Sequence, residues 1–169
     1  AEFNEQMAVQ KKQSKKLDKF KYDEENIDWI GAEEDLDPIF IGYDKISSES
    51  KIKRYYEKEG LVYIVLDKTP FYSESGGQVS DTGKIYNNSI NLGVVDVQKI
   101  DGLVCHICKV KKGKISMKDN LVIAEIDKDS RLKIMSNHTA THMLHEALKQ
   151  VLGPHVQQSG SLVEANRLR

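Results

Sequence analysis

A row of three histidines is the part of the sequence most capable of chemistry. His138 and His142 are four residues apart, and His145 follows three residues later. If this segment is helical, all three imidazoles emerge from one face, and a pair four residues apart has the ligand spacing of zinc sites carried on helices. Zinc takes about four ligands, or three and a water, so the pair would be half of a site. The remaining ligands must come from elsewhere.

Two cysteines are the obvious candidates to complete that site. Cys105 and Cys108 form a C-x-x-C motif, but the apolar residues around them indicate a strand, in which residues three apart point to opposite faces. No glycine or proline turns the chain between them, and 29 residues separate Cys108 from His138, more than a zinc finger uses. We therefore favour two reduced strand cysteines over a Cys2His2 site. His106, between them, is expected to be structural.

A glycine pair is the second candidate site. Gly76 and Gly77 lie within the segment Thr69–Gly83. Glycines adopt backbone angles that other residues avoid, and they let a ligand or another backbone approach closely. Neither phosphate-loop pattern, G-x-x-x-x-G-K or G-x-G-x-x-G, is present. The residues alone leave both a tight turn and a substrate cradle open.

Composition limits which elements can position these residues. The chain has 169 residues, of which 39% are hydrophobic and 30% charged, and its formal net charge is −1. These values suit one medium domain or a domain with an appendage, and any RNA contact must be local because no basic excess exists. No run of 18 apolar residues occurs and the N-terminus is charged, so we expect neither a membrane span nor a signal peptide, and a cytoplasmic protein.

Periodicity divides the chain into three parts and predicts an α+β fold. Residues 1–37 are expected to form a helical and acidic linker, with a helix at 3–21. Residues 38–127 are expected to form an antiparallel β-barrel-like module, and 128–169 a long helix that ends at Gly153-Pro154, with two short strands after it. Because that helix has no sheet to cover and the metal site lacks ligands, we expect a fragment of a longer protein. The barrel strands are predicted at 39–43, 52–56, 61–66, 84–86, 90–97, 103–110 and 121–126.

Taken together, the two motifs resemble the alanyl-tRNA synthetase family at the start of its editing domain. The match comprises an ordered series of segments: Thr69–Gly83, Ile126-Asp127…Arg131, His138-Thr139-Ala140-Thr141-His142, and Leu152-Gly153…Arg169. It covers nearly everything from Phe40 onwards, and Phe3…Lys11 looks like the segment that joins the family's tRNA-recognition region to its editing region. The resemblance implies a Gly-rich β-barrel followed by an α/β editing core, which is truncated here.

The resemblance also implies a function and a set of site residues. The family's editing domain hydrolyses the ester that joins wrongly attached serine or glycine to tRNA(Ala), so the expected partner is the 3′ acceptor end of tRNA(Ala). It implies zinc at His138 and His142, with the other ligands in a C-x-x-x-H motif beyond Arg169. Thr141 and Gln158 match editing-pocket positions, and Gly76 and Gly77 are expected to bind substrate. ATP and Mg belong to an upstream catalytic domain that is absent here.

Simpler interpretations accompany these roles. By local preference alone, Thr141 would bond back to its own helix and Gln158 would lie on an exposed turn. His145 lies outside the family's ligand pair and is expected to pack nearby or to support it. The chain in isolation could also be a non-catalytic structural and tRNA-binding module. A freestanding trans-editing protein is a further alternative, although the leading helix is unexpected for one.

Overall fold

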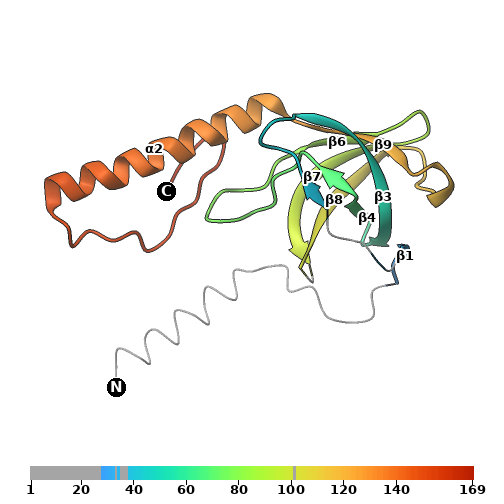
Figure 1. The fold of residues 1–169 in the computed structure, drawn as a ribbon, viewed down its shortest axis with the longest axis horizontal. Coiled ribbons are helices and arrows are strands. Elements are labelled where there is room, and N and C mark those ends of the chain that lie inside the picture. The colour runs from blue at the N-terminus through green and yellow to red at the C-terminus, as the bar shows by residue number, and fades with distance from the viewer. Residues whose placement is uncertain (1–27, 33, 35–37, 101) are drawn as a thin grey trace, which may run out of the picture.

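A β-barrel and one long helix make up the part of the chain that the structure describes. The computed structural model describes residues 28–32, 34, 38–100 and 102–169. The helix predicted at 3–21 lies outside these residues, as does most of the predicted linker. The strands are β1 (Ile30–Gly31), β2 (Ile39–Phe40), β3 (Ser47–Lys58), β4 (Leu61–Leu66), β5 (Lys68–Thr69), β6 (Gly83–Tyr86), β7 (Asn91–Ile100), β8 (Leu103–Lys112) and β9 (Leu121–Ile126). A 3-10 turn, η1 (Met117–Asp119), precedes β9, and helix α2 (Lys128–Leu152) follows it (Figure 1).

Six antiparallel strands close the barrel in the order β3-β4-β8-β7-β6-β9. Closure depends on β3, whose first half pairs with β9 and whose second half pairs with β4, with a register shift between Ile52 and Arg54. β1 extends the same side of β3 beyond β9. This arrangement leaves none of the six strands with a free edge along its whole length, which is how barrels avoid edge-to-edge pairing.

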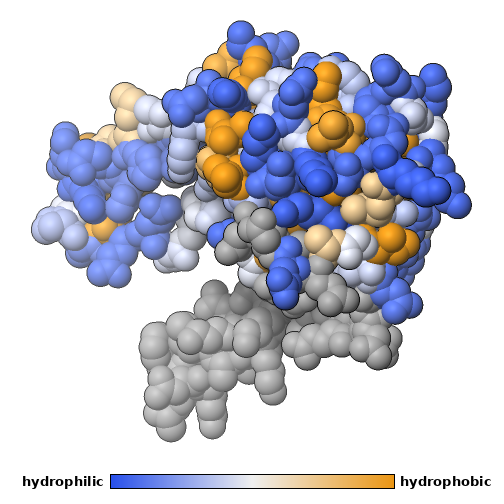
Figure 2. Space-filling view, turned by 45° about the vertical axis from the view of Figure 1, so that its right-hand side comes forward, coloured by the Kyte–Doolittle hydropathy of each residue, from blue (hydrophilic) through white to orange (hydrophobic). Residues whose placement is uncertain are grey.

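The barrel interior holds the main hydrophobic core. Inward-facing residues alternate with outward-facing ones, and Ile64, Leu66, Ile85 and Leu92 are fully buried in it. A smaller cluster of Tyr56, Tyr63, Ile100, Cys105 and Ile107 lies apart from this core, with Trp29 packed against it. On the face shown in Figure 2, hydrophobic side chains form separate patches among hydrophilic ones.

The two cysteines belong to different clusters, as the strand pattern predicts. Cys108 is part of the main core and Cys105 of the smaller cluster, and both thiols are free and buried. Burial raises the pKa of Cys105 to about 12 and that of Cys108 well above its usual value. Within the described ranges, no group of three or more His, Cys, Asp or Glu residues could hold a metal ion. A Cys2His2 site is therefore absent from this part of the chain.

Helix α2 ends where Gly153 and Pro154 predict, and the side chain of Asp127 caps its first turn. The Asp127 side chain accepts a hydrogen bond from the Ser130 amide at 3.0 Å, and the Gly153 amide donates to the Lys149 carbonyl at 2.9 Å. Ile134 is the one buried residue of α2, whereas Leu132, Met135, Met143 and Val151 are among its exposed apolar residues. No helix in the described residues combines the length and apolar character needed to cross a membrane.

Three of the predicted strands are shortened or missing in the structure. The strand expected at 39–43 is limited to β2, which pairs in parallel with β5. The two strands expected after α2 do not form, and Val163 instead makes isolated bridges to Gln78 and to Leu168. The backbone of this segment bonds on one side to the Gly-rich loop, through Val163, and on the other to its own last residues, where Leu162 and Arg169 exchange hydrogen bonds. The barrel and the helix of the predicted α+β fold are confirmed, while the editing core and the domain boundaries stay predictions.

Candidate functional site at helix α2 and the Gly-rich loop

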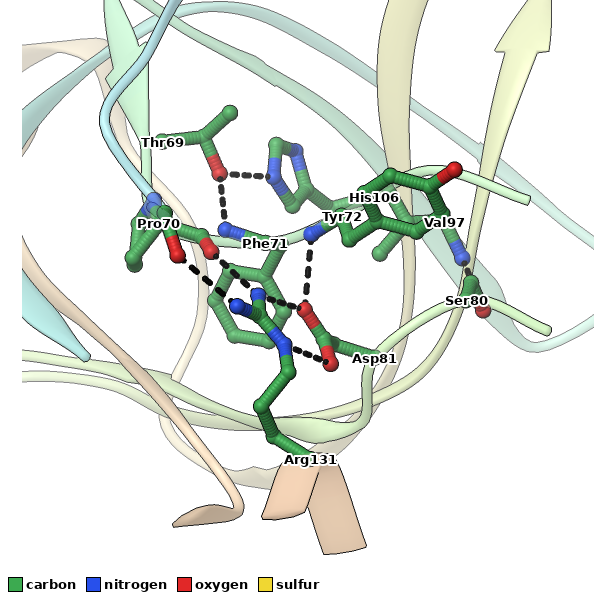
Figure 3. A network of polar contacts seen from close by, with 10 residues as sticks. Thr69, Pro70, Phe71, Tyr72, Ser80, Asp81, Val97, His106 and Arg131 are labelled. Carbon is green, nitrogen blue, oxygen red and sulfur yellow. Dashed lines mark hydrogen bonds and ion pairs between the residues drawn. The ribbon is translucent and has the colours of Figure 1, made fainter. Parts of the chain in front are cut away.

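A buried ion pair holds the first turn of α2 against the barrel. Arg131 makes a two-point contact with the Asp81 carboxylate, in which Nε donates to Oδ1 at 2.8 Å and Nη2 donates to Oδ2. Its remaining donors reach the Gly42 carbonyl at 2.7 Å and the Pro70 carbonyl at 3.0 Å. Only 2% of the Asp81 side chain and 11% of the Arg131 side chain are exposed. Figure 3 shows this guanidinium bridging the helix and the start of the Gly-rich loop.

A second buried network orders the entrance to that loop. The Thr69 hydroxyl donates to His106 Nε2 at 2.7 Å and accepts from the Phe71 amide at 3.1 Å (Figure 3). His106 Nδ1 donates to the Ile64 carbonyl at 3.0 Å. Because the imidazole is fully buried, its pKa falls to about 4, so the ring is neutral near pH 7. His106 is therefore structural, as its place in a strand indicates.

The glycine pair forms a tight turn, and the two glycines differ in what surrounds them. Ser75 and Gln78 exchange backbone hydrogen bonds around the turn, and Gly76 and Gly77 have φ of +60° and +81°. A Cβ on Gly77 would lie 2.3 Å from Ser161 Oγ and 2.5 Å from the Ser161 carbonyl oxygen, whereas one on Gly76 would meet nothing within 4 Å. The close approach at Gly77 is thus made by the chain's own backbone. Space for a ligand remains at Gly76.

The segment after α2 is tied to this turn and to the helix. The Val163 amide donates to the Gly77 carbonyl at 2.7 Å, and the Val79 amide donates to the Val163 carbonyl at 3.1 Å. The Asn137 side chain of α2 donates to the Glu164 carbonyl at 2.7 Å. With Val163 only 2% exposed, these bonds join the loop, the helix and the C-terminal segment into one site.

The histidine pair lies on α2 next to the same turn. His138 Nδ1 is 2.6 Å from Gln78 Oε1, and because an amide oxygen only accepts, Nδ1 donates this bond; in the neutral imidazole Nε2 then carries the lone pair. The His138 and His142 ring centroids are 4.9 Å apart and the rings are tilted by 32°. This arrangement fits two metal ligands, one of them already oriented by a partner. Gln78 was not predicted from the sequence; its place beside the glycine pair was the available signal.

Thr141 and Gln158 line the same cavity, and their roles in an editing pocket stay predictions. This cavity has a volume of about 210 Å³, and its lining also includes His145 and Ser161, whereas His138 and His142 are not among its lining residues. Thr141 Oγ1 donates to the Asn137 carbonyl at 2.8 Å, the back-bond that local preference indicates. The hydroxyl oxygen can still accept a hydrogen bond. His145 Nε2 is buried and has no hydrogen-bond partner within the described part of the chain.

Comparison with known proteins gives consistent matches along the chain. Residues 1–130 match the family model for class II tRNA synthetases (A). The chain is 43% identical over 183 residues to the alanine–tRNA ligase of Caldicellulosiruptor saccharolyticus, an alignment that covers 100% of this chain and 20% of that protein. It is 41% identical to the alanine–tRNA ligase of Francisella tularensis subsp. novicida over 99% of this chain and 20% of that protein. For the alanine–tRNA ligase of Thermoanaerobacter sp. the identity is 40%, over 98% of this chain and 19% of that protein. The chain therefore spans about one fifth of the length of these relatives.

Proposed function

The chain belongs to the family of class II alanyl-tRNA synthetases, and from this premise we propose that α2 and the Gly-rich loop form part of an editing site. This site hydrolyses the ester bond of Ser-tRNA(Ala) or Gly-tRNA(Ala). The parent synthetase attaches alanine to tRNA(Ala) with ATP and Mg in a part of the polypeptide outside this segment. The observation that carries the proposal is the meeting of Thr141, Gln158 and His145 at one cavity beside the histidine pair.

The chemistry of this cavity suits an enzyme that must remove serine. Serine differs from alanine by a hydroxyl, and a pocket that accepts alanine rejects such a close analogue only weakly, so a second site that reads the hydroxyl is the usual solution. Since Thr141 Oγ1 gives its own proton to the Asn137 carbonyl, its oxygen can accept a hydrogen bond from the serine hydroxyl or the amino group. Gln158 adds an amide that can donate and accept at the same cavity.

His138 and His142 are the residues that would hold a zinc ion. Gln78 accepts a hydrogen bond from His138 Nδ1, which leaves Nε2 as the nitrogen that would bind the metal. Loss of such a partner typically lowers metal affinity about 10- to 100-fold. Zinc bound there would polarise the ester or lower the pKa of a water molecule. The other ligands would come from the rest of the polypeptide, since the relatives are in total about five times as long as this chain.

The test compares two threonines one half-turn apart on α2. In the synthetase that contains this segment, Thr141→Val should slow hydrolysis of Ser-tRNA(Ala) by about tenfold or more, since one hydrogen bond is worth about 1.4 kcal/mol. Thr139→Val is the matched control, because Thr139 is exposed and makes the same kind of back-bond, to the Met135 carbonyl at 3.2 Å. Gln158→Ala should also slow hydrolysis. Equal rates for Thr141→Val and Thr139→Val would remove Thr141 from the pocket.

A second candidate function applies to the isolated chain, which would bind tRNA and serve as a scaffold without hydrolysing the ester. Two observations favour it: the described residues contain no group of three or more His, Cys, Asp or Glu that could hold a metal ion, and apolar residues of α2 are exposed. The 169-residue chain should then show no hydrolysis of Ser-tRNA(Ala) where the full synthetase does. Equal hydrolysis by both would contradict the requirement for further ligands.

A further inference from the structure

A second and larger cavity lies at the other end of the Gly-rich turn and has no part in the proposed hydrolysis. Its volume is about 440 Å³, within the usual range for ligand sites. Four aromatic residues line it: Phe40 and Tyr43 from β2 and the turn that follows, and Phe71 and Tyr72 from the entrance to the Gly-rich loop. Its chemistry is therefore that of a site for a flat, apolar-faced ligand.

Three of these aromatic rings contact one another, and one of them, Tyr43, is exposed. Phe40 meets Tyr43 edge-to-face at a centroid distance of 5.0 Å, and meets Tyr72 at 6.2 Å. Phe40 is thus supported on two sides, while Tyr43 is 86% exposed. An exposed ring held by an edge contact keeps a face available for stacking.

The polar part of the lining points to a negatively charged ligand. Lys99, at the end of β7, contributes an exposed ammonium group, and Ser73 and Ser75 contribute hydroxyls. None of the described residues that line this cavity is acidic. Stacking rings together with a lysine are the combination with which proteins bind unpaired nucleotides, the rings taking the base and the cation the phosphate.

A continuous path of residues joins this cavity to the one on α2. Ser75 lines the aromatic cavity, the next residue is Gly76, and the Gly76 carbonyl accepts from the hydroxyl of Ser161 at 3.5 Å. Ser161 in turn lines the α2 cavity. Between the two, Gly76 has no neighbour where a side chain would be, so a polynucleotide backbone can cross the turn there.

We propose that the aromatic cavity binds an unpaired nucleotide next to the 3′ end of the tRNA, while the terminal aminoacylated nucleotide enters the cavity on α2. This assignment rests on the proposed function for the identity of the RNA, although stacking at Tyr43 does not depend on hydrolysis. The occupant is single-stranded RNA, bound by its base and phosphate.

The direct test measures the binding of a fluorescent single-stranded RNA pentamer with the tRNA 3′ sequence to the 169-residue chain. Tyr43→Ala should weaken binding at least about fivefold, and Tyr43→Phe should stay within about twofold of the unmodified chain, because stacking needs the ring and not the hydroxyl. Leu121→Ala is the matched control, since Leu121 is an exposed apolar residue on β9 outside this cavity. Circular dichroism spectra verify that each variant is folded.

Several outcomes would overturn the assignment. They are the absence of pentamer binding by the unmodified chain, equal binding by Tyr43→Ala, equal binding of an RNA hairpin without unpaired nucleotides, and displacement of the pentamer by a proline-rich peptide.

The two proposals fail separately. A neutral Thr141→Val variant in the hydrolysis assay, with binding still lost in Tyr43→Ala, would refute the editing site and leave the aromatic cavity intact. The reverse pattern would refute the aromatic cavity alone.

Discussion

Removal of the Arg131 side chain should destabilise the fold more than any exposed substitution. Arg131→Met keeps the apolar stem but leaves the Asp81 carboxylate, 2% exposed, without its cation, and leaves the Gly42 and Pro70 carbonyls without a donor. Removing one partner of a buried pair typically costs about 3–5 kcal/mol, because the other charge stays buried and uncompensated. We expect a loss of that size in the free energy of unfolding.

Urea denaturation followed by circular dichroism at the helix signal measures this loss. Arg167→Ala is the matched control, because Arg167 also pairs with a carboxylate, Glu164, but its side chain is 67% exposed, and exposed pairs contribute about 0–1 kcal/mol. Adding Asp81→Asn to Arg131→Met should recover part of the loss, since the buried charge is then removed. If Arg131→Met cost no more than Arg167→Ala, the ion pair would not be what holds α2 to the barrel.

Three further predictions follow from buried or strained positions. His106 has a pKa of about 4 in the folded chain against 6.5 for the free side chain, so the unfolded chain binds the proton first. The free energy of unfolding should fall by about 3 kcal/mol as the pH drops from about 6.5 to about 4. Urea titrations of a His106→Gln variant should lack this part of the pH dependence. Gly76→Ala should cost about 1 kcal/mol of folding free energy, because of its positive φ alone. Gly77→Ala should lower the melting temperature clearly more, since a Cβ there would also clash with Ser161. Equal shifts in melting temperature would contradict the close backbone approach at Gly77. Cys105 and Cys108 should resist alkylation by iodoacetamide at pH 8 until the chain unfolds, and rapid labelling of the folded chain would show that they are not buried.

Local pattern was sufficient to predict the regular parts of this fold. β4 and β9 occupy the predicted residues 61–66 and 121–126, because each is a short apolar run between turn signals. The end of α2 follows from Gly153 and Pro154 in the same way. The separation of the cysteines could also be predicted, since it depends only on the two-residue period of a strand.

Contacts between distant segments could not be predicted in this way. Arg131 and Asp81 are 50 residues apart, and His138 and Gln78 are 60 apart, so no local period relates them. The strands expected at 155–163 were wrong for the same reason: Val163 bonds to Gly77 and Val79 of the Gly-rich loop, more than 80 residues earlier, and bridges Leu168 on its other side. The meeting of Thr141 and Gln158 was expected only through the family resemblance.

The most direct measurement of the central claim is the rate at which the synthetase that contains this segment hydrolyses Ser-tRNA(Ala), with and without the His138 imidazole. His138→Ala removes a proposed ligand that Gln78 holds in place, on a part of α2 that is only partly buried. We predict that hydrolysis is lost while attachment of alanine to tRNA(Ala) continues at its normal rate. Unchanged hydrolysis in that variant would contradict the placement of the editing site on helix α2.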